Sequence, residues 1–157
     1  MSAFLIHVGV DDCYRVPVLK GAGFFVEECR SVRGLGSTLI DFPEPDAIAI
    51  AESDEIEAGR AMALVRSSST APLILFQGRN RCLDASGFNL VIPPLTEPHA
   101  WLSDLVSLIE DSRQIRSRSR SIGAYSVLLR REAQVAVNKS RQERRRSAIL
   151  CNRLPHS

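Results

Sequence analysis

Cysteines and long apolar runs are both scarce in this sequence, and each scarcity excludes a class of protein. No Cys-x-x-Cys pair occurs and no histidine stands at metal-ligand spacing, which argues against a zinc site or a disulfide framework. No apolar run approaches the roughly 20 residues of a membrane helix, and the start of the chain shows no secretory signal pattern. We therefore expect a cytoplasmic protein with reduced cysteines. The four are Cys13, Cys29, Cys82 and Cys151.

Motifs for catalysis and cofactor binding are lacking as well. There is no P-loop, no glycine-rich dinucleotide turn and no Ser/His/Asp arrangement. His7 falls within an apolar run, where we expect it to be packed or hydrogen-bonded, and His99 and His156 have no nucleophile nearby in the sequence. These absences predict a protein without a cofactor and without enzymatic activity.

The net charge of +2 conceals an uneven distribution along the chain. Residues 1–112 contain 8 Lys or Arg and 16 Asp or Glu, whereas residues 113–157 contain 12 Lys or Arg and 2 Glu. Such asymmetry indicates a basic segment that contacts anionic partners or its own acidic neighbour. We predict a domain over 1–112, a basic helical extension over 113–150 and a disordered tail over 151–157.

Short apolar runs alternate with helix-like segments in the acidic part, which predicts an α/β domain with a parallel sheet. The unbroken run 46–51 fits a strand that is covered on both faces. Gly59 is expected to let its helix approach the sheet closely. The expected strands are 4–10, 24–29, 46–51, 72–76 and 88–92, and the expected helices are 13–20, 31–39 and one starting at Asp54 with Glu57 in a capping box.

Landmarks at the strand ends resemble those of the receiver domain of bacterial response regulators. Asp11 and Asp12 follow the first strand, Pro72 opens the fourth and Pro94 closes the fifth. The resemblance covers roughly residues 3–112. It implies a flavodoxin-like, doubly wound five-stranded parallel sheet, followed here by a long C-terminal helical extension.

The resemblance also implies a set of functional positions, most of which are altered here. In the family, an acidic pair holds Mg²⁺, an aspartate ending strand three accepts a phosphoryl group, and a hydroxyl residue and a lysine contact the phosphate. In this sequence the last three positions are Ala51, Gln77 and Pro93. Transfer to a carboxylate requires that nucleophile and those donors. The pattern therefore predicts a degenerate pseudo-receiver.

Two alternatives at this predicted pocket remain open. Asp11 and Asp12 could bind Mg²⁺ weakly, or one could cap the following helix while the other is solvated. Glu52 or Asp54 could replace the missing acceptor if its side chain faced the acidic pair, but a one-residue step along a strand turns a side chain to the opposite face. The predicted degenerate pocket comprises Asp11, Asp12, Ala51, Glu52, Gln77 and Pro93.

A seven-residue repeat predicts one continuous helix from about residue 98 to about residue 148. Beyond Asp111, glycine occurs only at Gly123 and proline only at Pro155. The repeat is typical of a coiled coil, although one column is small and the other contains a glutamate. The small column is Ser112, Ser119, Ser126, Ala133, Ser140 and Ser147. The aliphatic column is Ile115, Ile122, Leu129, Ala136, Glu143 and Leu150.

This helix has three interpretations: self-association, a lone and partly disordered helix, or a helix that requires another partner. Its arginines could contact nucleic-acid phosphates, or they could be solvated and balanced by the acidic domain. Our leading hypothesis is a non-enzymatic signalling or scaffold protein that acts through protein contacts, and the alternative is a nucleic-acid-associated protein. The arginines concerned are Arg116, Arg118, Arg120, Arg130, Arg131, Arg141, Arg144, Arg145 and Arg146.

Overall fold

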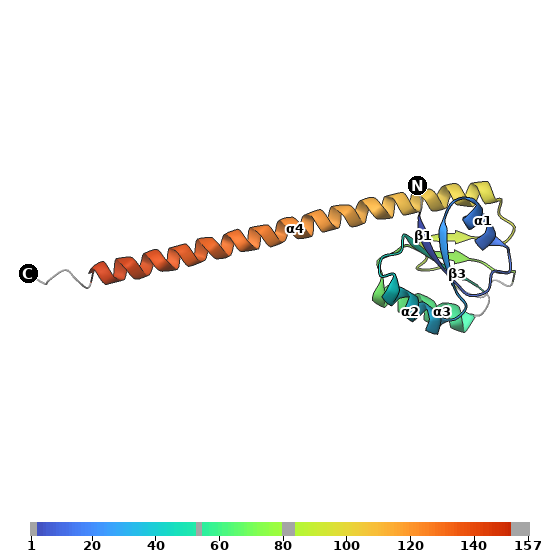
Figure 1. Ribbon diagram of the computed structural model, residues 1–157, viewed down its shortest axis with the longest axis horizontal. Helices are drawn as coiled ribbons and strands as arrows, with labels where there is room; N and C mark the ends of the chain where they lie inside the picture. Colours follow the sequence, from blue (N-terminus) through green and yellow to red (C-terminus); the bar gives the residue numbers. More distant parts are fainter. Residues whose placement is uncertain (1–2, 53–54, 80–83, 152–157) are drawn as a thin grey trace, which may run out of the picture. The chain divides into compact units, whose positions relative to one another are not determined.

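Five parallel strands form the centre of the protein in the computed structural model, which describes residues 3–52, 55–79 and 84–151. The order across the sheet is β2-β1-β3-β4-β5, and every neighbouring pair is parallel (Figure 1). This arrangement confirms the predicted flavodoxin-like sheet. The strands are β1 (Phe4–Val8), β2 (Phe25–Cys29), β3 (Ala47–Ala51), β4 (Leu73–Phe76) and β5 (Leu90–Ile92).

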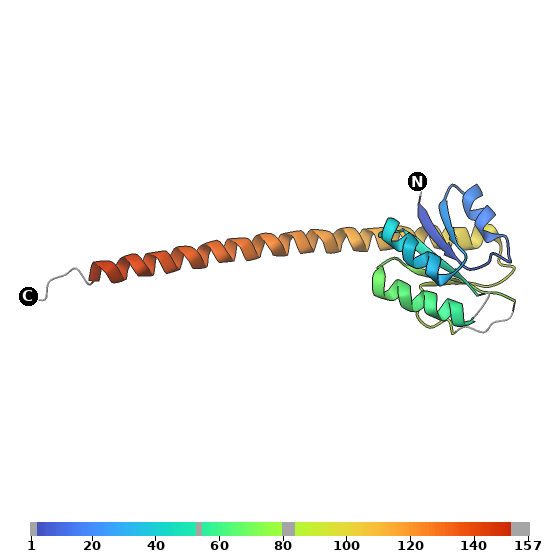
Figure 2. The ribbon, with the colours of Figure 1, turned by 60° about the horizontal axis from the view of Figure 1, so that its bottom comes forward.

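Helices cover both faces of the sheet. One layer consists of α2 (Val32–Asp41) and α3 (Glu55–Ser68), and the other of α1 (Arg15–Gly21) and the first part of α4 (Pro98–Cys151) (Figure 2). Each layer buries its own apolar cluster against the sheet. Because β3 and β4 are covered on both sides, all of their residues are buried, as the unbroken apolar runs predicted.

The connection from β4 to β5 contains no helix among its described residues, 77–79 and 84–89. Phe88 from this connection packs against the α2–α3 cluster. The Arg66 guanidinium of α3 donates to the carbonyl of Gly87 at 2.8 Å. The loop between β4 and β5 therefore contributes to the apolar cluster on the α2–α3 face of the sheet.

Two details differ from the sequence-based expectations. Strand β1 ends at Val8 rather than residue 10, because Gly9 has a φ of 102° and turns the chain out of the sheet. The expectation for Gly59 was wrong, since a Cβ built there would meet nothing within 4 Å. The predicted cap at Asp54 lies outside the described residues.

The chain divides into two units, Met1–Gln114 and Ile115–Ser157. Helix α4 runs from Pro98 to Cys151, which confirms the predicted long helix. Within the described residues, no helix combines the length and apolar character needed to cross a membrane.

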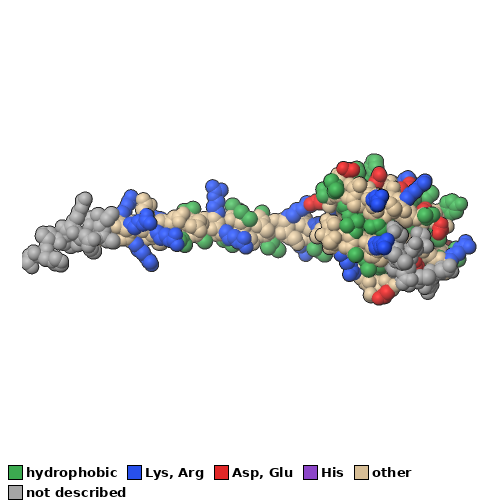
Figure 3. All heavy atoms as spheres, turned by 90° about the horizontal axis from the view of Figure 1, so that it is seen from below, with side chains coloured by type: hydrophobic (Ala, Val, Ile, Leu, Met, Phe, Trp, Pro, Cys, Tyr) green, Lys and Arg blue, Asp and Glu red, His purple; other side chains and the backbone are tan. Residues whose placement is uncertain are grey.

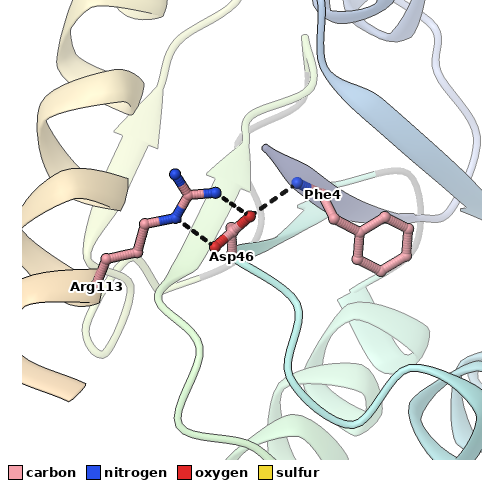
Figure 4. A network of polar contacts seen from close by, with 3 residues as sticks. All are labelled: Phe4, Asp46 and Arg113. Atoms are coloured by element: carbon pink, nitrogen blue, oxygen red, sulfur yellow. Dashed lines mark hydrogen bonds and ion pairs between the residues drawn. The ribbon is translucent and has the colours of Figure 1, made fainter. Parts of the chain in front are cut away.

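An ion pair holds α4 to the sheet just before the first unit ends. Arg113 donates from Nε to Asp46 Oδ1 at 2.7 Å and from Nη2 to Oδ2 at 2.5 Å, and the Phe4 amide donates to the same carboxylate at 2.9 Å (Figure 4). These bonds to Asp46 raise the pKa of Arg113. Bidentate pairing of this kind fixes direction as well as distance, so Asp46 joins the starts of β1 and β3 to α4.

Candidate functional site: a pocket at the carboxyl ends of the strands

A small pocket lies where β1, β3 and β4 end, the edge at which parallel α/β sheets bind their ligands. Its free volume is about 20 Å³, which is room for about one water molecule. Five of the six predicted pocket residues line this pocket, and Pro93 is the exception. The lining residues are Val10, Asp11, Asp12, Cys13, Arg15, Ala51, Glu52, Phe76, Gln77 and Gly78.

The acidic pair is displaced from the strand end. Val8 lies opposite Ile50 in the β1–β3 register, so Asp11 is two residues further from the sheet than the sequence landmarks predicted. The Asp11 carboxylate accepts from the backbone N–H groups of Arg15 at 2.9 Å and Val16 at 2.7 Å. Asp12 is exposed. This geometry matches the capping alternative, because Asp11 satisfies two amides in the first turn of α1.

The side chain of Arg15 enters this pocket and was not predicted. It is only 6% exposed, and its Nη2 donates to the carbonyl oxygens of Pro93 at 2.9 Å and Gln77 at 3.2 Å. Its guanidinium carbon lies 4.8 Å from the centre of the Phe76 ring, within the range of a cation–π contact. Burial lowers the pKa of Arg15. The guanidinium thus joins the ends of β4 and β5.

Glu52 is buried at the same edge, next to Ala51. Its Oε2 accepts from the Gly78 amide at 3.0 Å, and its own amide donates to Phe76 O at 2.9 Å. The carboxylate is therefore directed toward the loop after β4. Ala51 ends β3 with a methyl group.

The residues present do not fit a Mg²⁺ ion of the receiver type. Both oxygens of Asp11 accept backbone hydrogen bonds, and the Arg15 cation lies in the pocket where a metal would have to be placed. Among the residues that the structure describes, no group of three or more His, Cys, Asp or Glu could hold a metal ion.

His7 packs beneath this pocket, 5.9 Å from Phe76 between ring centres. It is fully buried, and its Nε2 has no hydrogen-bond partner. Burial lowers the pKa of His7 below its ordinary value of 6.5, although Asp11 and Glu28 act in the opposite direction and Arg15 in the same one. The ring is therefore neutral in the folded protein near neutral pH.

The depressed pKa of His7 predicts acid sensitivity. As the pH falls below 6.5, His7 binds a proton in the unfolded chain before it does so in the folded protein. The contribution of neutral His7 to stability is therefore fully present above this pH and declines below it. We expect His7→Leu to reduce the loss of unfolding free energy between about pH 7.5 and about pH 5.5, measured by urea titration. His99→Gln, at an exposed histidine, is the control and should leave the loss unchanged. An equal loss in His7→Leu and in the wild type would contradict this assignment.

In the second unit, arginine and apolar side chains are both exposed on the surface of α4 (Figure 3). Ile115 is 63% exposed, Ile122 67% and Leu129 47%. Of the nine predicted contact arginines, all are exposed except Arg116, which is partly buried. None of the nine falls in the small or the aliphatic column of the repeat. Seven of them fall in three columns that are neighbours on the helix surface, and the seam formed by the small and aliphatic columns contains no arginine.

Comparison with known proteins identifies the fold. No family model matches the sequence, and a search of curated proteins found no match. The N-terminal domain of the nisin resistance regulator NsrR, a lantibiotic response regulator, is 21% identical with a TM-score of 0.54, over 67% of this chain and 97% of that chain. A response regulator receiver protein from Burkholderia phymatum is 13% identical with a TM-score of 0.55, over 69% and 95%. The fold is that of a receiver domain.

Another similar solved structure covers more of this chain. A chain that fuses a yeast Spc42 trimeric coiled coil to another structure is 11% identical with a TM-score of 0.59, covering 87% of this chain and 98% of that chain. At these identities the comparisons establish the fold alone.

Proposed function

We propose that this protein is a non-enzymatic signalling module, in which a receiver-like domain that accepts no phosphoryl group acts through protein contacts. The observation that carries the proposal is Arg15. Its guanidinium lies in the pocket and binds the carbonyls of Gln77 and Pro93. A cation that belongs to the chain thus links the strand ends that a phosphate would otherwise contact.

The chemistry of the pocket supports the same proposal. Phosphoryl transfer needs a nucleophile in line with the leaving group and a cation to offset the transferred charge. Ala51 supplies no nucleophile, and the remaining volume of about 20 Å³ is close to that of one water molecule. Glu52, which follows Ala51 in the chain, accepts a hydrogen bond from the Gly78 amide.

Incubation with acetyl phosphate and Mg²⁺, followed by intact mass measurement, tests this part of the proposal. We expect no adduct on the wild type, whereas a receiver domain with its acceptor aspartate serves as the positive control. A stable adduct of one phosphoryl group would overturn the proposal. If Glu52→Gln then abolished that adduct, Glu52 would be the acceptor.

The second part of the proposal is self-association through α4. A helix gains most of its stability from packing an apolar face, yet Ile115, Ile122 and Leu129 are exposed on a seam without arginine. One of the similar solved chains contains a trimeric coiled coil by its description. The nucleic-acid alternative has less support, because Tyr125 is the only aromatic residue in 113–157 and the segment contains no recognised DNA-binding module.

Adjacent leucines provide a matched test of the seam. Leu129 lies in the aliphatic column, and Leu128 lies one column away with 57% exposure. We expect Leu129→Asp to reduce the assembly to a monomer in light scattering, because a charge cannot be buried in the seam without a partner. Leu128→Asp should leave the mass of the assembly unchanged. A wild-type monomer, or equal effects of the two variants, would contradict the proposal.

A further inference from the structure

We infer that the seam of α4 pairs with α4 of a second copy in the antiparallel direction. This inference rests on the proposed self-association and adds the direction and register of the pairing. It starts from the composition of the two columns between residues 112 and 147. One column contains only serine and alanine, and the other is mainly aliphatic.

Parallel pairing would place identical residues opposite one another. Layers such as Ser126 with Ser126 of the partner subunit would leave space between larger Ile122 layers. Glu143 would face Glu143 of the partner subunit, and like charges that face one another are destabilising. Both the packing and the electrostatics of the seam therefore disfavour this direction.

Antiparallel pairing places the small column of one helix against the aliphatic column of the other. Ser140 and Ser147 then each face a larger aliphatic residue, the alternation that lets facing positions interdigitate, and Ala133 faces Ala136 of the partner subunit. Ser140 packs against Leu129 of the partner subunit, and Ser147 against Ile122 of the partner subunit. Glu143 faces Ser126 of the partner subunit, which removes the contact between like charges.

The charges beside the seam select this register. When Ser140 lies against Leu129 of the partner subunit, Glu132 is level with Lys139 of the partner subunit, and the two-fold axis repeats this pair. Within the described helix, which ends at Cys151, no flanking pair then joins like charges. A shift of one heptad step would bring Glu132 against Glu132 of the partner subunit and Arg130 against Arg130 of the partner subunit.

Charge-reversal variants of the full chain, single and double, test the register. We expect Glu132→Lys to raise the dissociation constant roughly tenfold, because two attractive pairs become repulsive at the surface. Adding Lys139→Glu should restore the constant to within about threefold of the wild type. In a parallel dimer residues 132 and 139 do not face each other, so a double variant no tighter than Glu132→Lys would overturn the register. Sedimentation across a dilution series gives the constants.

Oxidative cross-linking tests the direction independently. In the antiparallel register, Ser119 and Ser119 of the partner subunit are about 45 Å apart along the helix axis, whereas the two Ala133 residues are offset by about 4.5 Å. We expect Ala133→Cys to form a cross-linked dimer on oxidation and Ser119→Cys to form no more than the wild type, which controls for the native cysteines. Cross-linking of Ser119→Cys would overturn the direction but not self-association. A monomeric wild type in light scattering would overturn both.

Discussion

Replacement of Arg15 by alanine is expected to lower the free energy of unfolding by about 3 kcal/mol. The guanidinium is 6% exposed and donates to two carbonyl oxygens. Its removal leaves those carbonyl acceptors without their charged donor. The contact with the Phe76 ring is lost as well. Urea unfolding followed by circular dichroism measures the difference.

Three further variants separate the contributions of Arg15. Arg15→Met retains much of the apolar stem but no donor, so we expect most of the loss to persist. Arg15→Lys retains a charge and should recover part of the stability, because one ammonium cannot reproduce the planar fork of donors. Arg33→Ala, at an exposed arginine of α2, is the matched control and should change stability by less than about 0.5 kcal/mol. A loss in Arg15→Ala no larger than in Arg33→Ala would show that the guanidinium does not hold the pocket together.

Replacement of Gly78 by alanine is expected to lower the free energy of unfolding by about 2–3 kcal/mol. A Cβ at this position would lie 2.6 Å from the carbonyl oxygen of Glu52. The obstructing atom belongs to the backbone, so it cannot rotate away as a flexible side chain would. The loop must move instead, which weakens the bond from the Gly78 amide to the Glu52 carboxylate.

The same substitution at Gly59 provides the control for Gly78. A Cβ there meets nothing within 4 Å, and the residue lies inside α3. Alanine is favoured over glycine in a helix by up to about 1 kcal/mol, so Gly59→Ala should stabilise the protein. Opposite signs at the two positions are the expected result. A neutral Gly78→Ala would contradict the close approach between the two loops.

The elements that follow from local patterns were predictable from the sequence. Unbroken apolar runs predicted β3 and β4, and the seven-residue repeat predicted the continuity of α4 across the division between the two units. In each case one stretch of chain contains the whole signal, because burial on both faces or on one helical stripe constrains every residue in it.

The contents of the pocket depend on residues that are far apart in the chain. Arg15 is the only Lys or Arg among residues 1–19, but nothing local shows that it reaches carbonyls 62 and 78 residues away. The direction of the Glu52 side chain likewise depends on the loop after β4. The end of β1 was placed too late, since the alternation of apolar residues continues to Val10 while the left-handed φ of Gly9 ends the strand.

A guanidinium anchored by its own main chain cannot diffuse away, be exchanged for another ion or be removed by hydrolysis. The bond between the ends of β4 and β5 therefore lasts as long as the polypeptide stays folded. Unlike a phosphoryl group, this link is not lost by spontaneous hydrolysis or by the action of a phosphatase. If such a molecule carries information, its abundance and its degradation are the variables through which a cell would adjust the message.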